Sequence, residues 1–235
     1  MKAIQYSCYG GPDVLNLVDL PIPVPEPDEV LIAVRCASII PGDWKVRAGH
    51  LKHLFPLDLP TIPGRDGAGV VAAIGPNCDW AAIGDELCFV TEHVEPGSCA
   101  EMVTRPRAMT VPKPSGTSFA EASAMIHAGV CAWIGLIETA DIRAGQNVLI
   151  HAGAGAIGGM AIQIAHHLGC HVTATCSTGN TEYVRNLGAD NVIAYDQIDF
   201  AESVVGQDVV FDLVGGDVHE RSCQVLKKGG TIVWL

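Results

Sequence analysis

Three glycines stand at a spacing that suits phosphate binding. Gly153, Gly155 and Gly158 fit the pattern G-x-G-x-x-G, directly after the apolar run NVLIH and before a helical-looking segment. The pattern alone is weak, because a chain with 26 glycines can produce it by chance. Its place between a predicted strand and a predicted helix favours a dinucleotide-binding turn. The alternative is a plain structural turn.

The residues of this turn have distinct expected roles. Gly153 allows the tight turn, Gly155 lets the backbone approach a pyrophosphate, and Gly158 lets helix and strand pack closely. Amide groups at the start of the helix, around Ala156 and Ile157, are expected to hold the phosphates with help from the helix dipole. The predicted pyrophosphate site comprises Gly153, Ala154, Gly155, Ala156, Ile157 and Gly158.

The end of the second predicted strand carries no acidic residue. Proteins that bind NAD through this turn usually have Asp or Glu about 20 residues further on, bonded to the ribose 2′-hydroxyl. Here the strand HVTAT runs into the residues Cys176, Ser177, Thr178, Gly179 and Asn180. No carboxylate is expected there to repel a 2′-phosphate, and neutral donors are present, which favours NADPH over NADH. The alternative is an ordinary polar loop.

The elements around the turn predict an α/β chain. The first half has short β-prone runs separated by turn residues, which predict a small, mostly antiparallel β-domain. Near residue 115 the character changes, and Ser118 with Glu121 forms a predicted capping box for a helix. Apolar strands then alternate with helical segments, as in βαβ units of a parallel sheet. On the helix after the glycines, the residues expected to face the sheet are Ile157, Ala161, Ile164 and Leu168.

The composition argues against several classes of protein. The chain has 235 residues, of which 49% are hydrophobic and 17% charged, as in a folded globular protein. A net charge of −12 disfavours nucleic acids and anionic membranes. No window holds the roughly 20 uninterrupted apolar residues of a spanning helix. The nine cysteines, an odd number without a C-x-x-C pair, predict reduced thiols in a cytoplasmic protein.

Long stretches in consistent order resemble the medium-chain dehydrogenase/reductase superfamily, in its zinc-free quinone oxidoreductase (zeta-crystallin-like) branch. They include MKAIQYSCYGGPDVLNLVD, IPGRDGAGVVAAIG, NVLIHAGAGAIG and DVVFDLVGG, and they cover essentially the whole chain. The resemblance implies a GroES-like substrate domain over residues 1–117 and an NADPH-binding Rossmann domain over 118–235, with substrate bound in the cleft between them. It also implies reduction of quinones or α,β-unsaturated carbonyls, often by homodimers.

The resemblance also bears on zinc. The metal-ligand positions of zinc-dependent members correspond here to Ile40, Arg65 and His127. Isoleucine cannot bind zinc and arginine essentially never does, so we expect no metal. Without a Lewis acid, hydride must pass to an acceptor that is already electron-poor, such as a quinone or enone. The protein is then expected mainly to orient the nicotinamide and exclude water.

Further site residues are implied by the resemblance. The family often has Asn where Ile40 stands, near the nicotinamide, and Thr where Cys131 stands, near the phosphates. Asp43 either lines the substrate side or fixes its loop, and His127 either gives a proton or is simply packed. Tyr195 either meets the 2′-phosphate or shields the sheet. The remaining residues assigned to the coenzyme are Ser177 and Asn180 at the 2′-phosphate, and Val214 and Gly215 near the nicotinamide ribose.

Members of this branch continue beyond the final run TIVWL. We therefore expect that the chain is a fragment or that another chain covers this edge. Two alternatives to a working reductase stay open, namely a non-catalytic NADPH-binding protein, like the crystallin members of the branch, and an inactive fragment. A zinc alcohol dehydrogenase is less favoured.

Overall fold

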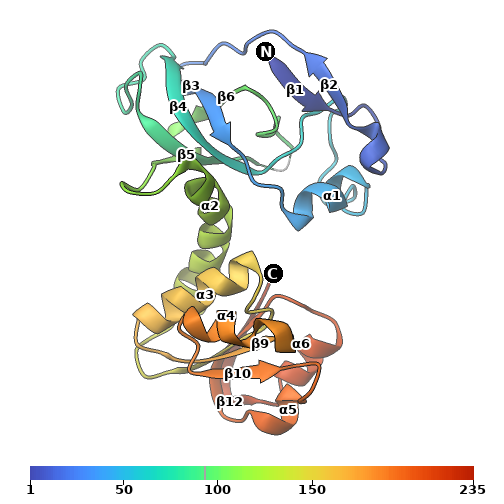
Figure 1. Cartoon of the computed structure of the whole chain (residues 1–235), viewed down its shortest axis with the longest axis vertical. Helices are drawn as coiled ribbons and strands as arrows, with labels where there is room; N and C mark the ends of the chain where they lie inside the picture. Colours follow the sequence, from blue (N-terminus) through green and yellow to red (C-terminus); the bar gives the residue numbers. More distant parts are fainter. Residues whose placement is uncertain (93) are drawn as a thin grey trace. The chain divides into compact units, whose positions relative to one another are not determined.

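The structure, a computed structural model, describes residues 1–92 and 94–235. The chain packs as two compact units, Met1–His127 (unit 1) and Ala128–Leu235 (unit 2). The division falls within one helix, α2 (Phe119–Trp133), as Figure 1 shows. The domain boundary expected between residues 117 and 118 stays a prediction.

Unit 1 consists mainly of antiparallel sheet. A five-stranded sheet has the order β6-β3-β4-β5-β7, and β1 pairs with β2 in a smaller sheet. The predicted antiparallel β-domain is confirmed. The β-prone runs that predict it are KAIQYSCY, VLNLVDL, EVLIAVRCASI, GAGVVAAIG and ELCFV, which correspond to β1 to β5, whereas β6 and β7 are not predicted. The strand bounds are β1 (Lys2–Gln5), β2 (Asn16–Asp19), β3 (Glu29–Cys36), β4 (Asp66–Ile74), β5 (Glu86–Val90), β6 (Met102–Pro106) and β7 (Thr110–Pro112).

The core of unit 1 lies on the central strands. Alternate residues of β3, Val30 and Ile32, are fully buried with Val71 of β4 and Phe89 of β5. After β3 the chain enters the loop that precedes α1. The unit's helices are η1 (Pro12–Val14), α1 (Pro41–Arg47) and η2 (Arg107–Met109).

The predicted capping box at the start of α2 is present. The Ser118 N–H donates to Glu121 Oε2 at 2.8 Å, and the Glu121 N–H donates to Ser118 Oγ at 3.2 Å. The two bonds satisfy amide groups that the helix itself cannot pair. Further along α2, Ala122 packs in unit 1 and Ala132 packs in the core of unit 2.

One apolar segment meets the length and composition of a membrane span. Phe119–Thr139, which joins α2 to the π-helix η3 (Ile134–Thr139), has 21 residues and a mean hydropathy of 1.4. Core helices of globular proteins meet the same criterion, so the segment is weak support for a span.

Unit 2 is built on a five-stranded parallel sheet of order β10-β9-β8-β11-β12. The predicted Rossmann-type sheet is confirmed. Strand order reverses beside β8, and sheets of this kind bind ligands outside the carboxyl ends of the strands at such a switch point. The element bounds are β8 (Asn147–Ile150), α3 (Ala156–His167), β9 (His171–Cys176), η4 (Thr178–Asn180), α4 (Thr181–Asn186), β10 (Asn191–Ala194), α5 (Phe200–Ser203), β11 (Gln207–Asp212), α6 (Asp217–Ser222) and β12 (Leu226–Trp234).

Helices cover both faces of this sheet. Val148 and Ile150 of β8 pack in one cluster with α3 and α4, whereas Leu149 packs in a second cluster with Phe200 of α5. Successive strand residues point to opposite faces, so the two clusters lie on opposite sides of the sheet. The apolar run NVLIH is buried on both faces for this reason.

The face predicted for α3 is right along most of the helix and wrong at its end. Ala161 is fully buried, and Ile157 and Ile164 pack against the core. Leu168 is 38% exposed, because α3 ends at His167 and Leu168 is its C-cap.

Candidate functional site

The glycine turn joins β8 to α3. It begins at Ala152, whose φ of 54° lies in the left-handed region, and Gly155 is the N-cap of α3. A Cβ on Gly158 would lie 2.3 Å from the Ala152 carbonyl oxygen and 2.9 Å from the Gly153 Cα. The first turn of α3 can approach the preceding backbone this closely only because residue 158 is glycine.

Backbone hydrogen bonds fix the rest of the turn. The Gly153 N–H donates to the Thr175 carbonyl of β9 at 2.8 Å, and the Gly155 N–H donates to the Ala152 carbonyl at 2.9 Å. Gly155 offers no side chain to cap α3, so the amide groups of the first helical turn, at Ala156 and Ile157, are available to an anion. Together with Ala154, this cradle fits a coenzyme pyrophosphate.

A cavity of about 590 Å³ lies at the carboxyl ends of the strands within unit 2. Small-molecule sites commonly have volumes of about 300–1,000 Å³. Its lining includes residues at or just after the ends of four strands and one residue of α5, namely His151 (β8), Thr175 (β9), Tyr195 (β10), Val214 (β11) and Phe200. Two predicted coenzyme residues, Tyr195 and Val214, are therefore brought to one cavity.

The loop after β9 faces a carboxylate that the sequence analysis did not expect. The Thr178 N–H and hydroxyl both donate to Asp196 Oδ1 at 2.9 Å. Asp196 follows Tyr195 at the end of β10, which pairs with β9 in parallel. Residues 176–180 themselves contain no carboxylate, as expected, but Asp196 reaches their loop from the next strand, because parallel neighbours end at the same sheet edge. Ser177 and Asn180 contact each other, with Asn180 Nδ2 donating to Ser177 Oγ at 2.9 Å.

The loop after β11 is fixed by one buried carboxylate. Asp212 Oδ1 accepts from the Val214 and Gly215 N–H groups at 2.9 and 3.0 Å, and Oδ2 lies 2.9 Å from His219 Nδ1. Burial by itself raises the pKa of Asp212, but these hydrogen bonds outweigh it and hold the pKa below its ordinary value. Asp212 thus fixes the two predicted nicotinamide-side residues, although sequence reasoning did not single it out.

His151 is a second residue that sequence reasoning missed. Its Nδ1 lies 3.0 Å from Thr175 Oγ1 and its Nε2 lies 3.0 Å from Ser222 Oγ. The Ser222 hydroxyl donates to the Val218 carbonyl, so Nε2 must carry the proton and Nδ1 must accept from Thr175. Burial lowers the pKa of His151 to about 4. The ring is therefore neutral and fixed at neutral pH.

Ile40 and Asp43 form the start of α1 in unit 1. The Ile40 N–H donates to Asp43 Oδ2 at 2.8 Å, and the Asp43 N–H donates to the Ile40 carbonyl at 3.0 Å. Burial raises the pKa of Asp43, while the bond from Ile40 opposes the rise. Asp43 Oδ1 is also buried and has no hydrogen-bond partner among the described residues. Asp43 therefore fixes the loop, whichever role it has beyond that.

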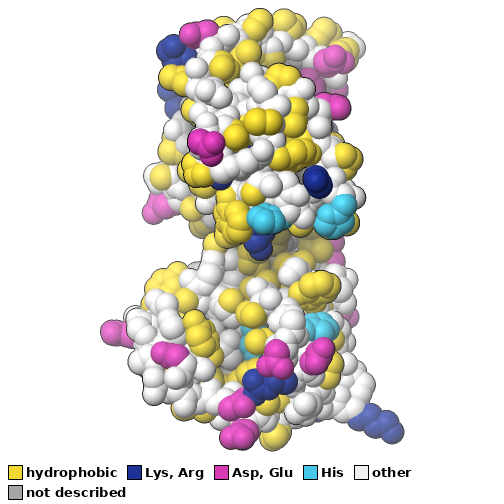
Figure 2. All heavy atoms as spheres, turned by 90° about the vertical axis from the view of Figure 1, so that its right-hand side faces the viewer, with side chains coloured by type: hydrophobic (Ala, Val, Ile, Leu, Met, Phe, Trp, Pro, Cys, Tyr) yellow, Lys and Arg dark blue, Asp and Glu magenta, His cyan; other side chains and the backbone are white. Residues whose placement is uncertain are grey.

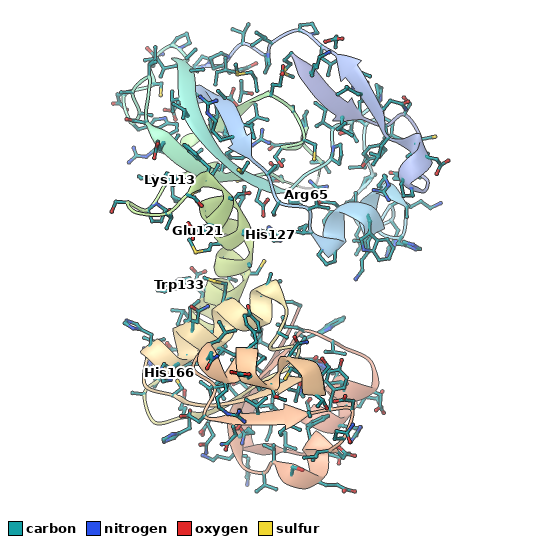
Figure 3. All side chains as sticks on the ribbon, viewed as in Figure 1. Arg65, Lys113, Glu121, His127, Trp133 and His166 are labelled. Carbon is teal, nitrogen blue, oxygen red and sulfur yellow. The ribbon has the colours of Figure 1, made fainter. Side chains whose placement is uncertain are left out.

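Other polar residues lie near Asp43. Asp66, at the start of β4, accepts from the Ser38 N–H and hydroxyl, yet burial still raises its pKa. Arg65 donates to the Glu92 carbonyl. Arg65 immediately precedes β4, and Figure 3 shows that His127 comes from α2. A positive charge on His127 lowers the pKa of Asp43 and Asp66, so His127 lies within electrostatic reach of both.

Two observations concern metal binding and Cys131. Within residues 1–92 and 94–235, no group of three His, Cys, Asp or Glu side chains is placed to hold a metal ion. Cys131 belongs to the part of α2 in unit 2, where it is half-buried, and burial raises the pKa of its thiol. It lies outside the residues that line the unit 2 cavity.

Known proteins match both halves of the chain. Residues 26–134 match the alcohol dehydrogenase GroES-like domain family, and residues 156–235 match the zinc-binding dehydrogenase family. A chloroplastic quinone-oxidoreductase homolog of Spinacia oleracea is 39% identical over 201 residues, covering 83% of this chain and 61% of its own length. A chloroplastic NADPH-dependent alkenal/one oxidoreductase of Arabidopsis thaliana is 38% identical over 244 residues, covering 100% and 62%.

A solved structure extends the match. The quinone oxidoreductase of Coxiella burnetii superimposes with a TM-score of 0.90 at 37% identity, covering 99% of this chain and 74% of that one. The chain spans less than two thirds of the two curated relatives, at 61% and 62% of their lengths. With both domain families in the expected order and this structural match, the chain belongs to the medium-chain dehydrogenase/reductase superfamily, in its quinone-oxidoreductase-like branch.

Proposed function

We propose that this chain belongs to an NADPH-dependent reductase of quinones or α,β-unsaturated carbonyls that works by hydride transfer without zinc. The observation that carries the proposal is the Gly158 approach to the Ala152 carbonyl, which leaves the start of α3 bare at the switch point of the sheet. The names of the Spinacia and Arabidopsis relatives support the substrate class, and the latter also supports NADPH.

The proposed coenzyme residues of unit 2 form three groups, each of which contacts a different part of the coenzyme. The glycine turn and the amide groups of Ala156 and Ile157 hold the pyrophosphate. Ser177, Asn180 and Tyr195 lie toward the 2′-phosphate, whereas Val214 and Gly215, fixed by Asp212, lie toward the nicotinamide. Bound NADPH supplies the hydride, and the protein orients the reactants and excludes water.

Zinc independence is proposed from the residues of unit 1. Arg65 and Ile40 occupy two of the three expected ligand positions, and neither side chain is a zinc ligand. Arg65 is only 6% exposed and its guanidinium donates to a carbonyl, so a fixed positive charge already lies there. A cation beside it would be repelled. Ile40, Asp43 and His127, all of which belong to unit 1, are proposed to shape the substrate side.

A non-catalytic NADPH-binding protein is the second candidate, and Ile40 favours it. Related proteins often have Asn at this position, which can form hydrogen bonds near the nicotinamide. The half-buried side chain of Ile40 is a hydrocarbon and cannot do so. Such a protein would keep the coenzyme cradle of unit 2 and lack turnover.

One experiment separates the two candidates. NADPH is titrated into the protein while its fluorescence is followed, and 1,4-benzoquinone or an enal is then added while absorbance of the reduced nicotinamide is followed. Enzyme-dependent NADPH oxidation supports the reductase, and binding without oxidation supports the second candidate. Absence of binding rejects both. Dialysis against a chelator is expected to leave the rate unchanged if no zinc takes part.

Assembly and location are also proposals. A homodimer is expected from the family, and sedimentation of the protein would test it. Both curated relatives described above are called chloroplastic, so the cytoplasmic location expected from the cysteines stays a prediction.

A further inference from the structure

The end of β9 presents two hydrogen-bond donors close together. They are the N–H and the hydroxyl of Thr178, two residues beyond the last residue of the strand, Cys176. In a dinucleotide-binding sheet, the adenosine ribose lies at this strand end, and a 2′-phosphate takes donors there. In this chain both donors already bind one carboxylate oxygen, Asp196 Oδ1, each at 2.9 Å.

Among the described residues, Asp196 forms no ion pair that balances its charge. Hydrogen bonding from Thr178 lowers the pKa of Asp196, so the group is ionised at neutral pH. None of the ion pairs found within residues 128–235 includes Asp196. Arg221, which lines the same cavity, pairs with Asp199 and Asp217 instead. Figure 2 shows acidic side chains beside basic ones on the visible face of unit 2.

We propose that Asp196 is a specificity-determining residue that opposes the 2′-phosphate and limits the preference for NADPH over NADH. The inference rests on the proposed binding of a nicotinamide coenzyme in unit 2. The mechanism has two parts. A bound 2′-phosphate must share or displace the Thr178 donors, and it is repelled by a carboxylate of the same sign. NADH meets neither obstacle, because its ribose carries a hydroxyl that can donate to a carboxylate.

The central test is the isosteric change Asp196→Asn. The Asn side-chain oxygen can still accept from Thr178, so the turn keeps its hydrogen bonds and loses only the charge. We expect NADPH to bind about three- to tenfold more tightly at low salt, a modest gain because the site is exposed and screened. NADH binding is expected to change less than twofold. Dissociation constants are measured by nicotinamide fluorescence, and by calorimetry with 2′,5′-ADP and 5′-AMP as probes without the nicotinamide.

Three further variants separate charge from structure. Glu202→Gln removes one negative charge from an exposed position of α5 and is expected to leave the ratio of the two affinities unchanged. Asp196→Ser removes the charge with a smaller side chain, so it replaces Asp196→Asn if that variant fails to fold. Thr178→Val removes the hydroxyl donor but keeps the carboxylate, and it is expected to weaken NADPH binding.

The outcomes are distinct. The proposal is supported if the NADPH/NADH affinity ratio is higher in Asp196→Asn than in the wild type and if this difference shrinks at 0.5 M salt, where the repulsion in the wild type is screened. An unchanged ratio, or a ratio that falls because Asp196 serves only to position the turn, overturns it. If the wild-type protein binds neither coenzyme, the proposed function itself fails, which is a different result from an unchanged ratio.

Discussion

A methyl group on Gly158 would need space that backbone atoms already fill, since the Ala152 oxygen would lie 2.3 Å away. Backbone yields far less readily than a side chain. We therefore expect Gly158→Ala to lower the free energy of unfolding by about 1–3 kcal/mol. Displacement of the α3 amide groups should also weaken NADPH binding by about tenfold or more, which is 1.4 kcal/mol. Urea unfolding and fluorescence titration measure the two effects.

Gly129→Ala is the matched control for this prediction. A Cβ there would meet only the flexible Met160 Cε, at 3.5 Å. Gly129 lies inside α2, where glycine is about 0.5–1 kcal/mol less favourable than alanine. The control should therefore stabilise the protein slightly and leave the coenzyme affinity alone. Wild-type NADPH affinity in Gly158→Ala would show that the turn does not carry the coenzyme.

His151 predicts a pH dependence of stability. Burial lowers its pKa from 6.5 to about 4, so the unfolded chain binds the proton more readily. Its contribution to stability is therefore fully present above about pH 6.5 and is lost as the pH falls toward 4. The loss reaches at most about 3 kcal/mol, at 1.36 kcal/mol for each unit of pKa.

Comparison with His151→Gln isolates this effect. Glutamine keeps a donor and an acceptor near Ser222 and Thr175 but does not titrate. Unfolding free energies measured from pH 7.5 to 4.5 should fall more steeply for the wild type than for the variant. Parallel curves for the two proteins would mean that His151 has an ordinary pKa in the folded state.

The residues of the site differ in how far the sequence could predict them. The glycine turn is local, so its spacing and flanking elements were enough to place it. Asp196 was missed because it acts on Thr178 across two strands, and only the pairing of β9 with β10 brings them together. His151 was missed for a related reason, since its partners Thr175 and Ser222 are 24 and 71 positions away. Asp212 was missed although its partners lie only 2 to 7 positions away, because no motif marks a carboxylate that binds its own loop. Strand-end position is the signal that all three share.

At the scale of elements, the start of α2 gives a direct test. Ser118 both accepts from Glu121 N–H and donates to Glu121 Oε2. We expect Ser118→Ala to lower the free energy of unfolding by about 1 kcal/mol, the usual loss for an N-cap. The neighbouring change Ser115→Ala lies in the loop before the helix and should have little effect. Equal thermal midpoints for both variants would rule out a stabilising cap.

Element prediction succeeded where pattern and burial agree. The apolar strands around β8 and the alternating β3 are clear, because one or both faces are buried. β6 and β7 are not predicted because each ends in proline, at Pro106 and Pro112. Proline cannot donate a hydrogen bond to a neighbouring strand, so a run that contains it is less readily identified as a strand. The run HERSCQVLKK, whose pattern predicts a helix over residues 219–228, is helical only at its start. α6 ends at Ser222, and β12 already begins at Leu226, through two lysines and two glycines.

At the scale of the whole molecule, the two units have separate cores and share one helix. Val30, Ile32 and Phe89 belong to a cluster within unit 1, whereas the two clusters on the parallel sheet lie within unit 2. Only α2 supplies buried residues to both units in the described clusters, through Ala122 and Ala132. We therefore expect each unit to unfold in a separate transition. A ligand that binds to one unit should stabilise that unit and raise only its transition.

We accordingly expect NADPH to raise only the unfolding transition of unit 2 in a calorimetric scan. A free concentration of 100 times Kd adds about 2.7 kcal/mol, or roughly 10 °C or more for a unit of about 100 residues. Tryptophan fluorescence assigns the transitions, because Trp44 and Trp80 lie in unit 1 whereas Trp133 and Trp234 lie in unit 2. In a Trp44→Phe, Trp80→Phe variant the remaining signal should follow the shifted transition. Gly158→Ala should show a smaller shift at the same NADPH concentration, since tenfold weaker binding leaves about 1.4 kcal/mol of stabilisation or less. An equal rise of both transitions would instead mean that the two units unfold together.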